Sequence, residues 1–109
     1  DATIAVTALN HDAKVYVHAN RGEYIDFAMP GVRLWTAVPG GGKYQDGTSF
    51  AAPFVTALAA AEIARSGKID SARLREILRP TAVDLGSPGK DPVFGYGLIK
   101  TPPACFASL

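Results

Sequence analysis

The chain begins with a run of residues that is apolar at both odd and even positions. Residues 3–9 are also rich in β-branched side chains, and together these features are typical of a strand covered on both faces in a parallel sheet. Residues 14–18 alternate between apolar and polar side chains, which predicts a half-exposed strand or an extended loop. Two further short strands are predicted at 24–28 and 32–38, on either side of a Pro-Gly turn at 30–31.

The hydrophobic period changes after a predicted glycine-rich loop at 39–42. Residues 48–66 are almost all helix formers, include seven alanines and are apolar around most of the helical girth. A helix of this kind requires cover on nearly all sides. Gly67 lies where a C-terminal cap belongs.

A second, shorter helix is predicted over residues 71–79, with Asp70 or Ser71 as its N-cap. Prolines fragment residues 81–109, where only 93–99 offers an apolar element. The charged side chains on and before the second helix are predicted to form a solvated face: Glu62, Arg65, Lys68, Asp70, Arg73, Arg75, Glu76 and Arg79.

Composition limits the class of protein. The 109 residues, 48% hydrophobic and 19% charged with a net charge of +1, describe one globular domain or a piece of a larger one. Intrinsic disorder is excluded, and nothing in this charge balance supports nucleic-acid binding. The only cysteine, Cys105, allows neither an intramolecular disulfide nor a cysteine-based zinc site, and we assign no metal ligand. A start at Asp1, with strand-like residues almost immediately after it, leads us to expect the C-terminal part of a longer protein.

The most informative stretch is 47–53, where a flexible loop meets the first turn of the long helix and presents the hydroxyl of Ser49. Unpaired N–H groups and the positive end of the helix dipole would stabilise negative charge developing there. Gly47, without a side chain, would let a substrate backbone come close. The alternative is structural: propensity alone starts the helix nearer Pro53, with Thr48 or Ser49 as a cap.

The sequence Gly-Thr-Ser-Phe-Ala-Ala-Pro resembles the nucleophile motif of the subtilisin-like serine proteases, the subtilases (peptidase S8). Further segments resemble that family in the same order: residues 4–9, 19–22, 25–37 and 95–99. The resemblance implies an α/β fold, the C-terminal part of a subtilisin-like three-layer arrangement with a mostly parallel sheet. It also implies that residues 1–109 form part of one catalytic domain.

By this resemblance Ser49 is the nucleophile, its own N–H is an oxyanion donor, and Gly47 borders the substrate cleft. The family's catalytic Asp and His lie in Asp-Thr-Gly and His-Gly-Thr motifs that this chain lacks. We therefore expect a segment of a serine endopeptidase that is inactive alone, because a serine hydroxyl needs a base. The alternative is a non-catalytic or degenerate piece that acts only through assembly.

Other titratable residues receive structural interpretations. His11 and His18 are expected to be exposed or locally hydrogen-bonded histidines rather than the base. Asp26 and Asp84 are expected to be turn or surface carboxylates. Asp46 stands where the family usually has a neutral residue, and we expect it to point outward.

The resemblance also carries expectations about partners and location. The parent is expected to act on peptides or proteins, and to be secreted or periplasmic. Calcium is a cofactor implied for the parent, through loops mostly outside this segment. The strand at 3–9 requires neighbours on both edges, so we expect exposed apolar surface together with self-association or pairing with an upstream part of the protease.

Overall fold

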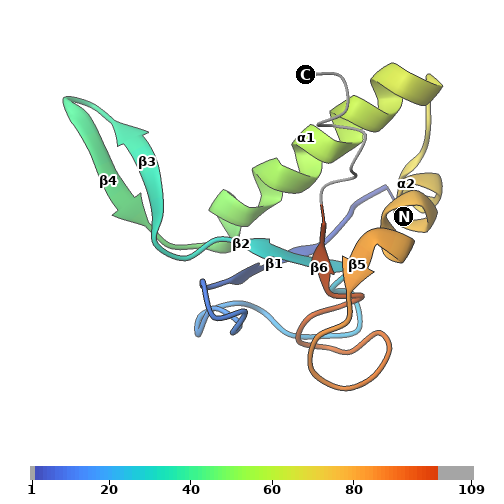
Figure 1. Ribbon diagram of the computed structural model, residues 1–109, viewed down its shortest axis with the longest axis horizontal. Coiled ribbons are helices and arrows are strands. Elements are labelled where there is room, and N and C mark those ends of the chain that lie inside the picture. Colours follow the sequence, from blue (N-terminus) through green and yellow to red (C-terminus); the bar gives the residue numbers. More distant parts are fainter. Residues whose placement is uncertain (1, 101–109) are drawn as a thin grey trace.

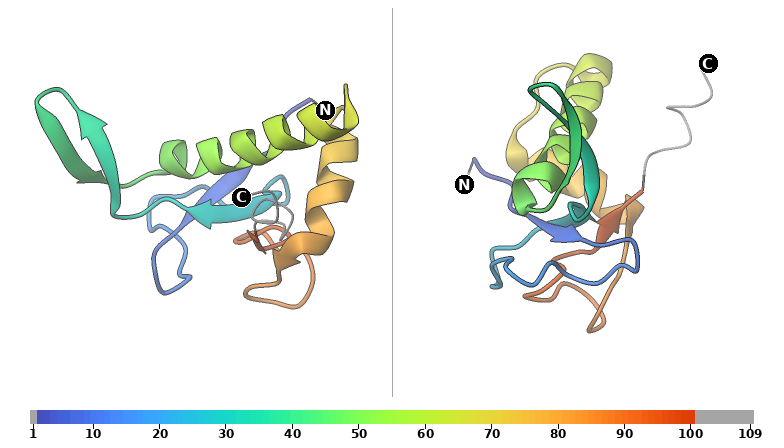
Figure 2. Two further views of the ribbon diagram at one scale, coloured as in Figure 1. Left: turned by 45° about the horizontal axis from the view of Figure 1, so that its top comes forward. Right: turned by 90° about the vertical axis from the view of Figure 1, so that its left-hand side faces the viewer.

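The computed structural model describes residues 2–100, which form a four-stranded sheet, a separate β-hairpin and two α-helices. The sheet has the order β1-β2-β6-β5, and it consists of β1 (Val6–Leu9), β2 (Phe27–Pro30), β5 (Ala82–Val83) and β6 (Leu98–Ile99). Strands β1, β2 and β6 run parallel, and β5 pairs antiparallel with β6. Helix α1 (Thr48–Ser66) crosses one face of the sheet, and loops lie on the other (Figures 1 and 2). The mostly parallel α/β architecture is confirmed.

Strand β1 is the part of the predicted 3–9 strand that finds a partner. Its pairing with β2 begins at Val6, because the preceding Ala5 N–H donates to the Asp26 carboxylate instead of to a strand. Thr7 and Ala8 point to opposite faces and are both buried, as expected for a strand covered on both sides. The other edge of β1 is covered at its carboxyl end, where the Ala8 carbonyl accepts the Tyr16 N–H and Leu9 bridges to Val15. Beside Val6 this edge pairs with no strand of residues 2–100.

Strand β2 is displaced from its predicted position. The strand expected at 24–28 begins at Phe27 and ends at Pro30, because the N–H groups of Asp26 and Phe27 both donate to the Ala5 carbonyl and Ile25 closes a turn onto Gly22. Pro30 ends the strand, where a missing N–H costs least.

Two other predicted apolar segments are mostly irregular. Residues 14–18 form the extended-loop alternative, held by an isolated bridge between Val15 and Leu9. The element predicted at 93–99 reduces to β6, with tight turns before it.

The prediction of a loop at 39–42 is wrong for its second half. Strands β3 (Leu34–Val38) and β4 (Gly41–Gln45) form an antiparallel hairpin joined by Pro39 and Gly40 alone. Gly40 has a φ of 85°, which suits the third position of a type II turn after proline. The Trp35 ring lies over Gly42, where a Cβ would come within 2.7 Å of it. The hairpin projects away from the sheet (Figure 1).

Helix α1 has the predicted bounds, and Gly67 caps it with a φ of 82° and an N–H bonded to the Ile63 carbonyl. Residues 2–100 do not supply the cover that such a helix requires. Only Ala51 and Val55 are buried, whereas Phe54 and Ile63 remain 42% and 46% exposed. The expected exposed apolar surface is therefore present. No helix among residues 2–100 has the length and hydropathy to span a bilayer.

Helix α2 (Ser71–Leu78) ends one residue before its predicted end, and Arg79 begins the short 3-10 helix η1 (Arg79–Thr81). Of the two candidate caps Asp70 is the one used, because its carboxylate accepts the N–H of Arg73 at 2.8 Å. Leu74 and Leu78 bury its apolar side in the core. Among residues 2–100 the main contacting cluster of the core comprises eight buried residues: Ala8, Phe27, Met29, Ala51, Val55, Leu74, Leu78 and Ile99.

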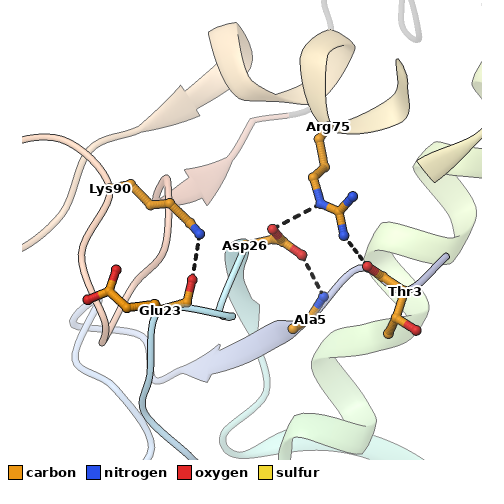
Figure 3. Close-up of polar contacts among 6 residues, drawn as sticks. All are labelled: Thr3, Ala5, Glu23, Asp26, Arg75 and Lys90. Carbon is orange, nitrogen blue, oxygen red and sulfur yellow. Dashed lines mark hydrogen bonds and ion pairs between the residues drawn. The ribbon is translucent and has the colours of Figure 1, made fainter. Parts of the chain in front are cut away.

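The predictions that Asp26 is a turn or surface carboxylate and that Arg75 lies on a solvated face are wrong. The Asp26 side chain is only 8% exposed and that of Arg75 23%, and the Arg75 Nε lies 3.0 Å from the Asp26 carboxylate (Figure 3). The second carboxylate oxygen accepts the Ala5 N–H at 2.9 Å, and the guanidinium also donates to the Thr3 carbonyl. This network ties α2 to the segments that precede β1 and β2. Lys90 similarly donates to the Glu23 carbonyl.

Candidate active site

Gly47 begins the helix that carries Ser49. It is the N-cap of α1, with a φ of 149° that favours glycine, and its carbonyl accepts the N–H of Phe50 at 3.0 Å. Thr48 and Ser49 are the first two helical residues. The interpretation of Thr48 or Ser49 as the cap is therefore wrong.

The Ser49 hydroxyl is exposed at this junction. Neither its oxygen nor the Ser49 N–H makes a hydrogen bond to residues 2–100. No acidic residue lies in the first turn of α1. Pro53, inside the helix, has no N–H to offer the Ser49 carbonyl. An oxygen that gains negative charge beside Ser49 would thus meet N–H groups and the positive end of the helix, without a carboxylate in that turn.

Close packing fixes the start of α1 on the sheet. Buried Gly31, directly after β2, accepts the Gly47 N–H at 2.8 Å. A Cβ on Gly31 would lie 2.5 Å from the Ala8 Cβ and 2.8 Å from the Gly47 carbonyl oxygen. No larger residue therefore fits without moving the sheet and the helix apart.

A pocket of about 230 Å³ lies between Thr48, the start of β1 and the residues that precede β2. The Thr7 hydroxyl is buried there and has no hydrogen-bond partner among residues 2–100. Gly47 does not line this pocket. Its lining residues are Ala5, Val6, Thr7, Asn20, Tyr24, Ile25 and Thr48.

Neither histidine forms a hydrogen bond with Ser49. His11 lies in the turn after β1, where its Nε2 is 3.4 Å from the Asp12 carboxylate, and His18 is exposed with its ring edge-to-face with Tyr16. The interpretation of both as surface histidines is confirmed. Asp84 is likewise a turn carboxylate, which accepts the Gly89 N–H.

Asp46, the residue before Gly47, is exposed as expected. Its carboxylate accepts the backbone N–H of Arg33 at 2.7 Å and so is engaged with the hairpin base. The sequence marked Asp46 as unusual but did not indicate this partner. No group of three or more His, Cys, Asp or Glu side chains in residues 2–100 could hold a metal ion.

Comparison with known proteins places this geometry in one family. Residues 1–97 match the sequence model of the Subtilase family. The chain is 34% identical over 102 residues to the minor extracellular protease Epr of Bacillus subtilis (strain 168), covering 91% of this chain and 16% of that protein. It is 36% identical over 101 residues to a subtilisin of Bacillus pumilus, covering 91% of this chain and 35% of that protein.

A solved structure agrees. Fervidolysin from Fervidobacterium pennivorans, a keratinolytic enzyme related to subtilisin, superposes with a TM-score of 0.79 at 27% identity, covering 91% of this chain and 18% of that one. The chain therefore spans about a third or less of these relatives.

Proposed function

Because the chain belongs to the subtilase family, we propose that it supplies the nucleophile, Ser49, of a subtilisin-like serine endopeptidase that acts on peptides or proteins. The observation that carries the proposal is the exposed, unbonded Ser49 hydroxyl in the first turn of α1, within Gly-Thr-Ser-Phe-Ala-Ala-Pro. On this proposal residues 1–109 are part of one catalytic domain.

The proposed reaction proceeds through an acyl-enzyme. The Ser49 oxygen attacks the peptide carbonyl carbon while its proton passes to a histidine, and the carbonyl oxygen becomes an oxyanion that the Ser49 N–H stabilises. Collapse breaks the C–N bond, and the departing amine takes the proton from the histidine. Water then hydrolyses the ester and returns the proton to Ser49. Gly47 gives the substrate backbone room beside the nucleophile.

The histidine and the carboxylate that orients it are proposed to come from polypeptide upstream of this chain. Two features support such a partner: the edge of β1 beside Val6, which pairs with no strand of residues 2–100, and the exposed apolar side of α1 at Phe54 and Ile63. The isolated chain is accordingly proposed to be inactive, because loss of the base removes on the order of 10⁶-fold of the rate.

Labelling with a fluorophosphonate tests the proposal, because the probe requires an activated serine. The isolated chain should not react. Addition of an upstream polypeptide carrying Asp-Thr-Gly and His-Gly-Thr should give labelling at Ser49, which Ser49→Ala abolishes and the control Ser66→Ala does not. Absence of labelling in the wild-type complex, or labelling at another serine, would refute the proposal.

A second candidate function is assembly without catalysis. It is favoured by an apolar pocket of about 360 Å³ lined by residues before β1, in α1 and in α2, where Ile63 is exposed and Ile4 and Ile69 are only partly buried. A second copy of the chain would bury this surface. Sedimentation velocity should then show dimers at micromolar concentration, and a well-folded monomer at all concentrations would count against it.

The remaining proposals concern the longer parent. The name of the Bacillus subtilis relative describes an extracellular protease, which supports a secreted or periplasmic location here. From the family alone, calcium is proposed to bind loops of the parent that lie mostly outside this chain. No step above depends on calcium.

A further inference from the structure

We infer that Asp46 is a positioning residue for Ser49, a role that rests on the proposed nucleophilic function of Ser49. Its carboxylate joins the base of the β3-β4 hairpin to the start of α1. It acts through Arg33 and Gly47 and does not touch the reacting atoms.

Two hydrogen bonds, from the Arg33 N–H to Asp46 and from the Gly47 N–H to Gly31, form what we call the clamp. The clamp begins where the backbone pairing of the hairpin ends. The last backbone pair is Leu34 with Gln45, and one residue further the Asp46 side chain replaces the backbone by accepting the Arg33 N–H at 2.7 Å. The next residue, Gly47, donates its own N–H to the Gly31 carbonyl at 2.8 Å. Two successive residues before the helix are thus tied to the loop after β2.

Arg33 is the unusual partner in this clamp. Its φ of 55° is a left-handed conformation that side-chain-bearing residues rarely adopt unless the surroundings hold them. Asp46 holds the backbone of Arg33, and the guanidinium lies 5.2 Å from the centre of the Tyr44 ring. Loss of the carboxylate would let Arg33 relax to negative φ, and the relaxation would pull on the residues that precede Ser49.

The chemistry points to an acceptor and not to a charge. The donor is a neutral backbone N–H, and an amide oxygen at the same position can accept it. Asp46→Asn should therefore keep the clamp, and Asp46→Ala should break it. Asp12, an exposed carboxylate in the turn after β1, provides a control for loss of one negative charge.

Kinetics in the complex with the upstream polypeptide test the role. Asp46→Ala should lower kcat for a peptide substrate by about tenfold or more with KM nearly unchanged, because a small misplacement of the nucleophile slows chemistry. Asp46→Asn and Asp12→Ala should stay within about twofold of wild type. A wild-type kcat for Asp46→Ala, or an equal loss in Asp46→Asn, would overturn the inference.

A measurement on the isolated chain separates this inference from the proposed function. In NMR spectra, the amide resonances of Arg33, Gly47 and Ser49 should shift from their wild-type positions in Asp46→Ala and stay close to them in Asp46→Asn. Circular dichroism should confirm that both variants fold. Unchanged resonances in Asp46→Ala overturn the clamp whether or not the complex is active. Failure of the wild-type complex to react with the fluorophosphonate refutes the proposed function instead.

Discussion

The ion pair between Asp26 and Arg75 provides a stability test that can be worked from the structure. Arg75→Ala removes the guanidinium and leaves the Asp26 carboxylate, whose side chain is 8% exposed, with its hydrogen bond from the Ala5 N–H but without its ion pair. Arg73→Ala on the same helix is the matched control, because the Arg73–Glu76 side chains are 62% and 67% exposed. Both changes replace arginine by alanine in α2, so the helix-propensity effect is common to them.

The expected magnitudes differ severalfold. Breaking a buried pair by removing one partner costs about 3–5 kcal/mol. Arg75 is 23% exposed, so water can partly replace it, and we expect a loss of about 3 kcal/mol in the free energy of unfolding. Breaking the exposed pair should cost about 0.2–1 kcal/mol.

Urea unfolding followed by circular dichroism at 222 nm measures both losses. The single tryptophan, Trp35, is exposed and would report the hairpin more than the core. With slopes of about 1–3 kcal/mol per molar urea, Arg75→Ala should lower the midpoint by at least about 1 M. If Arg75→Ala does not fold, Arg75→Lys should give an intermediate loss, because it keeps the charge without the planar fork. Equal midpoints for the Arg75 and Arg73 variants would refute the reasoning.

Three further predictions concern packing, pH and association. Gly31→Ala should lower the free energy of unfolding by about 3 kcal/mol, because the new methyl group would overlap Ala8 and the Gly47 carbonyl. Gly40→Ala, at the open hairpin tip, should cost only about 1 kcal/mol of backbone strain. Equal urea midpoints for the two variants would contradict this. The hydrogen bond from the Ser66 hydroxyl is the largest cause of the lowered pKa of Glu62. The ionised Glu62 carboxylate therefore stabilises the folded state fully at a pH above the ordinary glutamate pKa, and this stabilisation is lost as the pH falls through the lowered pKa. A carbon-13 titration should show the low pKa, and Ser66→Ala should raise it; an unmoved pKa would disprove the cause. Ile63→Glu should weaken any self-association seen by sedimentation, because it puts a charge on the exposed apolar face, and unchanged dimerisation would place the interface elsewhere.

Local signals in the sequence predicted the elements that depend on neighbouring residues. Helix α1 was predicted over its observed range, because the change of hydrophobic period after 39–42, the alanine-rich run and Gly67 after it act within one or two turns. Pro53, in the second turn, removes one hydrogen bond, to the Ser49 carbonyl, and does not end the helix. The place of Ser49 where the loop meets the helix followed from the same short stretch, whereas the glycine N-cap did not.

Elements that depend on a distant partner were predicted less well. Strand β2 starts where the Ala5 carbonyl is available, not where its β-rich sequence starts. The hairpin was missed because glycines at 41 and 42 indicate a loop until Trp35 is known to pack over them. Asp46 was recognised as unusual, but its bond to Arg33 required the two strands to be placed side by side.

From the sequence alone came the long helix and a serine near its amino end, because helix periodicity and propensity operate over a few positions. The α/β class came from the resemblance of several short motifs to one family. Only the tertiary structure decided that Asp26 and Arg75, 49 residues apart, form an ion pair shielded from solvent, and that segment 14–16 covers the carboxyl end of β1. Burial and pairing of this kind depend on which distant segments lie side by side in the fold. A charged residue in a polar stretch of sequence is therefore assigned to the solvated surface, although a distant partner of opposite charge can allow it to be buried.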